Sequence, residues 1–135
     1  MVTPVTARCN CGNLRFTSTR EPFLQLTCHC AQCRAVSKSP STNFAFFKLA
    51  ETEVSGKTVV HHFTAESGAK TVRETCAACG DMLLDRTDGF PKIIGVVADM
   101  IQPPYAFEPR CHVWVDSKLA GVVVPEGIKV FERGM

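Results

Sequence analysis

The segment CAACG, residues 76–80, has the C-x-x-C-G layout of a zinc knuckle. Its glycine, Gly80, suits the positive φ with which a backbone turns beneath a bound ion. A second pair, CNCG at residues 9–12, separates its cysteines by one residue, so in an extended segment both sulfurs point to the same side. Four thiolates make a closed tetrahedral zinc site that contributes folding free energy. The expected ligands of this structural zinc are Cys9, Cys11, Cys76 and Cys79.

The segment CHCAQC, residues 28–33, adds three cysteines within one short loop. A C-x-C-x-x-C loop can wrap one ion from three sides, so the seven sulfurs divide into four and three. Three protein ligands with an open fourth position are typical of catalytic zinc sites, because the open position takes water or a substrate atom. We therefore expect a second zinc, with a catalytic role, at Cys28, Cys30 and Cys33.

Two other interpretations of these three cysteines stay open. A second structural zinc would need a fourth ligand, either Cys111 or a histidine. A redox pair at Cys30 and Cys33 is less favoured, because no thioredoxin-like βαβ pattern surrounds it. Cys111 is extra to the pattern of seven, and we interpret it as a small buried hydrophobe, since free cysteine is commonly buried and inert.

The start of the chain and its composition limit the cellular setting and the partners. The N-terminus lacks the basic and apolar regions of a signal peptide, so we expect a cytoplasmic protein, in which dense cysteines indicate metal or catalytic chemistry rather than disulfides. The formal charge is +2, from 15 basic and 13 acidic residues without a basic run, which argues against nucleic acid as a partner. No apolar stretch approaches the roughly 18 residues that span a bilayer, so we expect no membrane partner.

Strand patterns dominate the sequence. With 135 residues, of which 45% are apolar and 21% charged, the chain fits one folded domain over residues 1–135. Alternating, aromatic-rich or β-branched runs bounded by turn residues predict strands at 13–19, 42–49, 57–65 and 92–100. Helical signals are short, with a turn or two expected in AQCRAVSKS (31–39) and one turn in AETEVSG (50–56). The fold class is therefore mostly β with short helical turns. The aromatic residues expected in a strand core are Phe44, Phe46 and Phe47.

These motifs resemble the glutathione-dependent formaldehyde-activating enzyme family, which includes centromere protein V-like proteins. The resemblance runs along nearly the whole chain, through CNCGNLRF (9–16), CHCAQCR (28–34), HHFTAESGAKTVRETCAACGDML (61–83), KIIGVVADM (92–100) and PRCHVWVDSK (109–118). It implies a single-domain, zinc-bearing β-tent with one structural and one catalytic zinc. The ligand sets that it implies agree with the four-and-three division of the seven cysteines.

The resemblance also implies a reaction. The family is described as joining glutathione and formaldehyde into S-(hydroxymethyl)glutathione, a carbon–sulfur lyase reaction in reverse. Three thiolates on Zn²⁺ leave a net charge of about −1, which suits a soft thiolate as fourth ligand better than it suits activation of water. We therefore expect a zinc-dependent carbon–sulfur lyase whose partner is a small thiol, with glutathione as the implied thiol. The competing function is a non-catalytic zinc module that binds a thiol, another small ligand or a protein. A homodimer is compatible with either function.

A proton must reach the oxygen of the new adduct, and the histidines are candidates to carry it. His112, in PRCHVW, is the expected general acid or base, because relatives commonly have a histidine after a proline there and neutral imidazole suits that role. His29 lies between two expected ligands, with its side chain expected to face away from the ion. The remaining histidines, His61 and His62, are expected to be structural. Arg34 and Lys38 are either contacts for substrate carboxylates or part of a solvated face.

Overall fold

The computed structural model describes residues 4–134, which form two β-sheets. The larger sheet has the strand order β11-β10-β3-β4-β9-β8-β7-β6. Its strands, in chain order, are β3 (Leu24–Cys28), β4 (Thr42–Lys48), β6 (Thr58–Thr64), β7 (Lys70–Cys76), β8 (Met82–Thr87), β9 (Ile93–Val97), β10 (Cys111–Val113) and β11 (Lys129–Val130). Neighbours from β3 to β6 are antiparallel, whereas β10 runs parallel to both β3 and β11.

The smaller sheet and the helices complete the described elements. The smaller sheet is antiparallel, in the order β1-β2-β5, and its strands are β1 (Val5–Arg8), β2 (Arg15–Ser18) and β5 (Thr52–Ser55). The helices are α1 (Ala31–Ser37) and the short 3-10 turns η1 (Leu49–Glu51), η2 (Ala98–Met100) and η3 (Val115–Ser117). None of the helices within residues 4–134 is long and apolar enough to cross a membrane.

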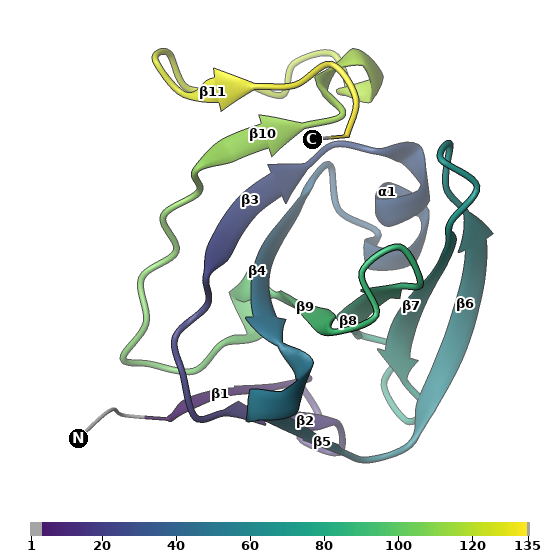
Figure 1. Cartoon of the computed structure of the whole chain (residues 1–135), viewed down its shortest axis with the longest axis vertical. Coiled ribbons are helices and arrows are strands. Elements are labelled where there is room, and N and C mark those ends of the chain that lie inside the picture. The colour runs from purple at the N-terminus through teal and green to yellow at the C-terminus, as the bar shows by residue number, and fades with distance from the viewer. Residues whose placement is uncertain (1–3, 135) are drawn as a thin grey trace.

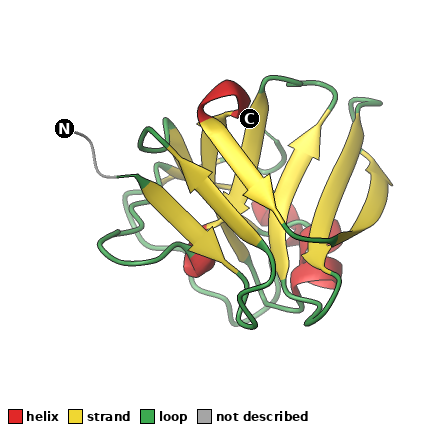
Figure 2. Ribbon diagram, turned by 90° about the horizontal axis from the view of Figure 1, so that it is seen from below, coloured by secondary structure: helices red, strands yellow, loops and turns green. Residues whose placement is uncertain are grey.

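The two sheets and α1 lie at different levels of the molecule. Figure 1 shows the smaller sheet below the large one, and α1 near the upper end, between β3–β4 on one side and β6–β7 on the other. Figure 2, seen from below, shows that strands make up most of the structure and that the helices are short. The mostly β, single-domain fold class expected from the sequence is confirmed, and the fold carries two cysteine clusters that could hold metal ions.

Two apolar clusters fill the interior. The first joins the two sheets through buried residues such as Leu14, Phe16 and Phe47. The second lies around β3, α1 and β10, and it contains Cys28, Cys33 and Cys111 among its buried members. The expected aromatic core in β4 is confirmed for Phe44 and Phe47, which are buried, while Phe46 is half-buried and packs over Gly95.

Most of the expected elements are present, with one correction. The four predicted strand segments correspond to β2, β4, β6 and β9, and the turns expected after Cys30 form α1. The segment 50–56 was expected to make one helical turn. Its first residues do end the 3-10 turn η1, but Thr52–Ser55 pair with β2 as strand β5. Cross-strand pairing with β2 outweighs the weak helical propensity there, because sheet context overrides local preference.

Candidate metal centres

The two knuckles meet where the ends of β1 and β7 approach each other. Cys9 directly follows β1, Cys76 ends β7, and Cys11 and Cys79 lie in the turns that follow. Both turns close on a glycine with positive φ, +80° at Gly12 and +81° at Gly80. The conformation expected for Gly80 is thus confirmed, and the turns bring four sulfurs within 4.8 Å of one another.

Backbone groups orient these sulfurs. The amide of Leu14 donates to Cys9 Sγ at 3.4 Å, and the amide of Ala78 donates to Cys76 Sγ at the same distance. The amide of Asn10 in the first knuckle donates to Asp81 Oδ2 in the second at 2.9 Å. The two knuckles are therefore joined by the carboxylate of Asp81 as well as by the contact between the sulfurs of Cys11 and Cys76. Such outer contacts commonly fix the orientation of metal ligands.

The sulfur separations fit a zinc ion. Two ligands at about 2.3 Å from an ion and at a tetrahedral angle lie about 3.8 Å apart. The separations are 3.4 Å between Cys9 and Cys11, 3.6 Å between Cys11 and Cys76, and 3.7 Å between Cys28 and Cys33. Both clusters can therefore hold a metal ion of the size and ligand preference of zinc.

The second cluster is built at the junction of β3 and α1. Cys28 is the last residue of β3, Cys30 is the N-cap of α1, and Cys33 lies in its first turn. The amide of Cys33 donates to Cys30 Sγ at 3.3 Å, so Cys30 caps the helix through its sulfur. The three sulfurs lie within 4.8 Å of one another. We call Cys28, Cys30 and Cys33 the trio.

The trio has no fourth protein ligand in the part of the chain that the structure describes. No further cysteine, histidine, aspartate or glutamate places a ligand atom within the same 4.8 Å cluster. Cys111 is buried in the second apolar cluster, on β10 opposite Leu26, as expected for a small hydrophobe. The donor set is thus three thiols, which leaves one position of a tetrahedral ion free for another ligand.

The close contacts among the three sulfurs shift the pKa values of Cys28 and Cys30 in opposite directions. Hydrogen bonds from Cys28, and then from Cys33, lower the pKa of Cys30 to about 2. The same contact with Cys30 raises the pKa of Cys28 above its ordinary range, and burial adds to that effect. Thiolates this close repel one another, and a bound cation relieves that repulsion.

An arginine that the sequence analysis did not single out contacts the trio. Arg73 on β7 is buried, with 6% of its surface exposed, and its Nη2 donates to Cys33 Sγ at 3.2 Å. Its Nε lies 3.6 Å from Asp85 Oδ1 on β8. Burial alone would lower the pKa of Arg73, but Asp85 and Cys33 outweigh burial and raise it. The arginine is therefore a permanent cation beside the sulfurs. Burial raises the pKa of Asp85 to about 6.

The sequence does contain a signal for this pair. Arg73 and Asp85 lie at equal distances on either side of Cys79, as expected for cross-strand partners in a hairpin that turns at CAACG. A charged residue that the strand alternation places on the buried face usually has a partner on the neighbouring strand. Pairing the two flanks of the knuckle would thus have found both residues.

His29 and His112 form a buried pair, and His29 lies between two residues of the trio in the sequence. His29 Nε2 and His112 Nδ1 are 2.9 Å apart, and the rings stack with centroids 5.1 Å apart. His112 lies on β10, and its neighbour Val113 pairs with Cys28 on β3. Burial lowers the pKa of both histidines, and for His29 the charge of His112 adds to that effect. His29 is outside the cluster of sulfurs, in agreement with a side chain that faces away.

The other expected site residues have structural positions. Arg34 is half-buried and donates through Nη1 to the backbone oxygens of His29 and Ser117, so its guanidinium links α1 to η3. Lys38 is exposed and caps α1 in the left-handed conformation. In β6, His61 Nε2 lies 3.1 Å from Thr75 Oγ1, a structural contact with β7, and its neighbour His62 is exposed.

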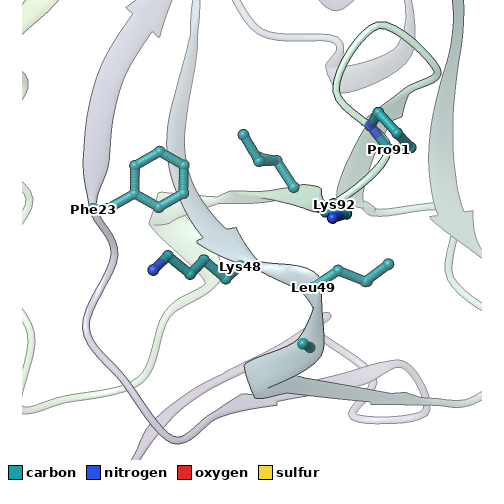
Figure 3. Close-up of a pocket in the computed structure, with 7 residues that line it drawn as sticks. Phe23, Lys48, Leu49, Pro91 and Lys92 are labelled. Atoms are coloured by element: carbon teal, nitrogen blue, oxygen red, sulfur yellow. The ribbon is translucent and has the colours of Figure 1, made fainter.

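An apolar groove lies at the other end of β4. Figure 3 shows the side chains of Phe23, Lys48, Leu49, Pro91 and Lys92 around this groove of about 710 Å³. Lys48 ends β4, whereas Thr42 at its start pairs with Cys28 of the trio. The groove is therefore separated from the trio by the length of the strand, and no cysteine lines it.

Comparison with known proteins gives one family and one fold. The sequence matches the family described as glutathione-dependent formaldehyde-activating enzyme over residues 4–117. Among curated proteins, none matches the chain. A crystal structure of a Rhodobacter sphaeroides protein from structural genomics has a similar fold, with a TM-score of 0.54 and 18% sequence identity. The alignment covers 93% of this chain and 98% of that one.

Proposed function

The chain belongs to the glutathione-dependent formaldehyde-activating enzyme family, and we propose that it joins a small thiol, such as glutathione, to formaldehyde. The product is the S-hydroxymethyl adduct, and the reverse reaction is that of a carbon–sulfur lyase. In this proposal Cys9, Cys11, Cys76 and Cys79 hold a structural zinc. The trio holds the catalytic zinc and leaves one position for the substrate sulfur.

One observation carries the proposal: the three sulfurs of the trio gather without a fourth protein ligand among residues 4–134. Zinc bound there supplies a Lewis-acidic centre that favours the thiolate over the thiol form of the substrate. The three cysteines fix where the substrate sulfur binds. Burial of Cys28 and Cys33 limits access of water to that position, which favours addition to the aldehyde over side reactions.

His112 is proposed to carry the proton. Its Nδ1 is engaged with His29, which leaves Nε2 for exchange with the substrate. Burial keeps the ring neutral at pH 7, and with the ring proton on Nδ1, donated to His29 Nε2, the free Nε2 can accept the thiol proton. A bond then forms between sulfur and the aldehyde carbon, the carbonyl π electrons move to oxygen, and the histidine returns the proton to that oxygen. Thiol and formaldehyde give the adduct with no other reactant.

X-ray absorption at the zinc edge tests the open position. Seven cysteine sulfurs shared by two zinc ions average 3.5 sulfurs per ion, and entry of one thiol raises the average to 4. We expect this rise when millimolar glutathione is added to the fully loaded protein. An average of 4 without thiol, lowered by Cys111→Ala, would mean that Cys111 closes the second site and would exclude the enzyme function.

Turnover separates the enzyme from a non-catalytic thiol-binding module. Exchange of ¹³C-formaldehyde with its glutathione adduct can be followed by NMR, with the spontaneous rate subtracted. We expect the protein to accelerate exchange and His112→Gln to reduce the acceleration by about 10²-fold or more, the usual contribution of a general acid–base. Thiol entry at the zinc edge without acceleration would identify a binding module.

A further inference from the structure

The buried side-chain polar atoms that lack a hydrogen-bond partner within residues 4–134 are concentrated beside the trio, although two of them, Arg73 Nε and Asp85 Oδ1, face each other at 3.6 Å. In the described part of the chain, four buried side-chain atoms have no hydrogen-bond partner, and they are Arg73 Nε, Arg73 Nη1, Asp85 Oδ1 and His29 Nδ1. His29 lies between two residues of the trio, and Arg73 donates to the third. Buried polar groups are nearly always paired in folded proteins, so such a concentration points to a site for a polar ligand.

Arg73 is the only one of these residues that carries a permanent positive charge. One of its terminal nitrogens, Nη2, is used by Cys33, while the other, Nη1, has an N–H to spare. The Phe63 ring lies 5.4 Å from its guanidinium carbon and helps to hold the group in place. The guanidinium is thus buried, fixed and still able to donate.

The negative charge of the metal-bound trio gives the guanidinium of Arg73 a role. Three thiolates around a divalent ion carry a net charge of about −1, and a substrate thiolate makes it about −2. A buried charge of that size is costly unless a cation compensates it. A neutral ligand adds no charge and needs no compensation. The cation therefore matters most for ligands that enter as anions.

We propose that Arg73 determines the specificity of the trio for anionic thiolate substrates, by compensating the charge that the substrate sulfur brings and by donating to it through Nη1. Asp85 holds the guanidinium from the other side, at 3.6 Å, and its own negative charge opposes thiolate entry. This inference rests on the proposed thiol-binding function of the trio.

The two partners of the ion pair are expected to act in opposite directions. Arg73→Gln removes the compensating charge and weakens thiolate binding. Asp85→Asn removes the opposing charge while keeping the shape of the side chain, and it tightens thiolate binding at pH 8, above the Asp85 pKa of about 6. An ion pair with a purely structural role would instead affect binding in the same direction in both variants.

A neighbouring ion pair provides a matched control. Arg86 Nε on β8 lies 2.9 Å from Glu74 Oε2 on β7, so it joins the same two strands as the Arg73–Asp85 pair. Arg86 makes no hydrogen bond to the trio among the described residues. Arg86→Gln therefore removes a cross-strand pair without changing the charge beside the sulfurs, and we expect unchanged thiol binding.

The measurement uses protein loaded with cobalt(II), whose sulfur-to-metal absorption bands respond to ligands at an open site. The probes are 2-mercaptoethanol, which carries no charge besides its thiolate, and imidazole, a neutral ligand. We expect Arg73→Gln to bind 2-mercaptoethanol at least about tenfold more weakly, since a charge lost within a few ångströms costs that much or more. Imidazole binding changes by less than about twofold, and Arg73→Lys restores part of the thiol affinity.

Each outcome decides a different point. Failure of the wild-type protein to take up either probe at the trio would refute the proposed function together with this inference. Thiol uptake that is equal in the wild type and Arg73→Gln would refute the inference alone. Loss of both probes in Arg73→Gln and Asp85→Asn would assign the pair a structural role and overturn the inference. If Arg73→Gln fails to fold, Asp85→Asn decides the point: tighter binding of 2-mercaptoethanol with unchanged imidazole binding supports the inference, and unchanged or weaker thiol binding refutes it.

Discussion

Burial determines how the paired imidazoles of His29 and His112 respond to pH. His29 is fully buried and His112 is 6% exposed, and burial lowers the pKa of each. In the unfolded chain both titrate near 6.5. As the pH falls below 6.5, the unfolded chain therefore takes up protons that the folded protein does not, and the histidines oppose folding increasingly.

This linkage predicts a pH-dependent effect of His112→Gln. Above pH 6.5 the contribution of neutral His112 to stability is fully present, and it is lost as the pH falls below that value. The free energy of unfolding of the wild type, measured relative to His112→Gln, should fall by up to about 1.4 kcal/mol per pH unit in that range. Urea unfolding at pH 8 and pH 5.5 measures it. A difference between the two proteins that stays constant with pH would contradict the lowered pKa.

At the residue scale, the sequence identified the cysteines but not the charges around them. The spacing of CxC, CxCxxC and CxxCG is local in the sequence. The two cysteine clusters of the structure could therefore be predicted from that spacing. The contact of Arg73 with Cys33 joins β7 to α1, which are far apart in sequence, and no local pattern encodes it. The contact of Arg34 with the backbone oxygen of Ser117 in η3 likewise joins residues that are far apart in sequence.

At the scale of elements, β7 shows why some strands were not predicted. Its buried positions include Thr71, Arg73 and Thr75, so the face that points inward is polar. The apolar alternation that identifies a half-buried strand is therefore missing. The strand that was missed, β7, is the one that places the charged Arg73 at the candidate site. Departures from the usual strand pattern are expected at functional sites. The aromatic-rich β4 and the apolar β9 follow the rules and were predicted.

The contact between the two knuckles gives a prediction at this scale. Asp81 Oδ2 accepts the Asn10 amide at 2.9 Å and so joins the two halves of the four-cysteine site. Asp81→Ala should accelerate loss of the more tightly held zinc to a chelator by about tenfold or more, the usual effect of removing an outer contact of a metal site. A colorimetric chelator that reports zinc release with time measures this rate.

The same hairpin provides the control. At its other end Asp88 Oδ1 accepts the Lys70 amide at 2.8 Å, far along the strands from the cysteines. Asp88→Ala should lower stability by about 1 kcal/mol, as for loss of one hydrogen bond, and leave zinc release unchanged. Equal acceleration in both variants would show that general loosening of the hairpin, rather than the link between knuckles, controls release.

At the scale of the whole molecule, the four-cysteine site joins the two sheets. Outside their named strands, the described part of the chain has a single isolated bridge, Ala7 to Ile101, that links the smaller sheet to the segment after β9. Other links include the hydrogen bond from the Gln102 amide to the Thr6 oxygen at 2.8 Å, the contact of the Asn10 amide with Asp81, side-chain packing around Leu14 and Phe16, and the cysteine cluster itself. The sequence predicted this connection, since CNCG near the start of the chain and CAACG in its middle were expected to share one structural zinc. It did not predict the strand order, which depends on long-range pairing.

The last prediction follows from the different places of the two clusters in this architecture. Cys79→Ser breaks the site that joins the sheets, and a closed thiolate site contributes on the order of 10 kcal/mol to folding in small zinc peptides. Cys30→Ser removes one sulfur from the trio, which lies at the junction of β3 and α1 within one sheet. We therefore expect Cys79→Ser to lose both zinc and stable folding, and Cys30→Ser to lose only the more exchangeable zinc.

Amide hydrogen exchange shows which strands lose protection in each variant. In Cys79→Ser, protection should be lost first in β1, β2 and β5, because that sheet depends most on the cluster, and should persist longer in β4 and β9 at the centre of the large sheet. Cys30→Ser should keep wild-type protection in all five strands. Elemental analysis of the wild type should find two zinc ions per chain, matching the two clusters. If Cys30→Ser unfolds as readily as Cys79→Ser, the trio is itself a structural site, and the division of the cysteines into a closed and an open set is wrong.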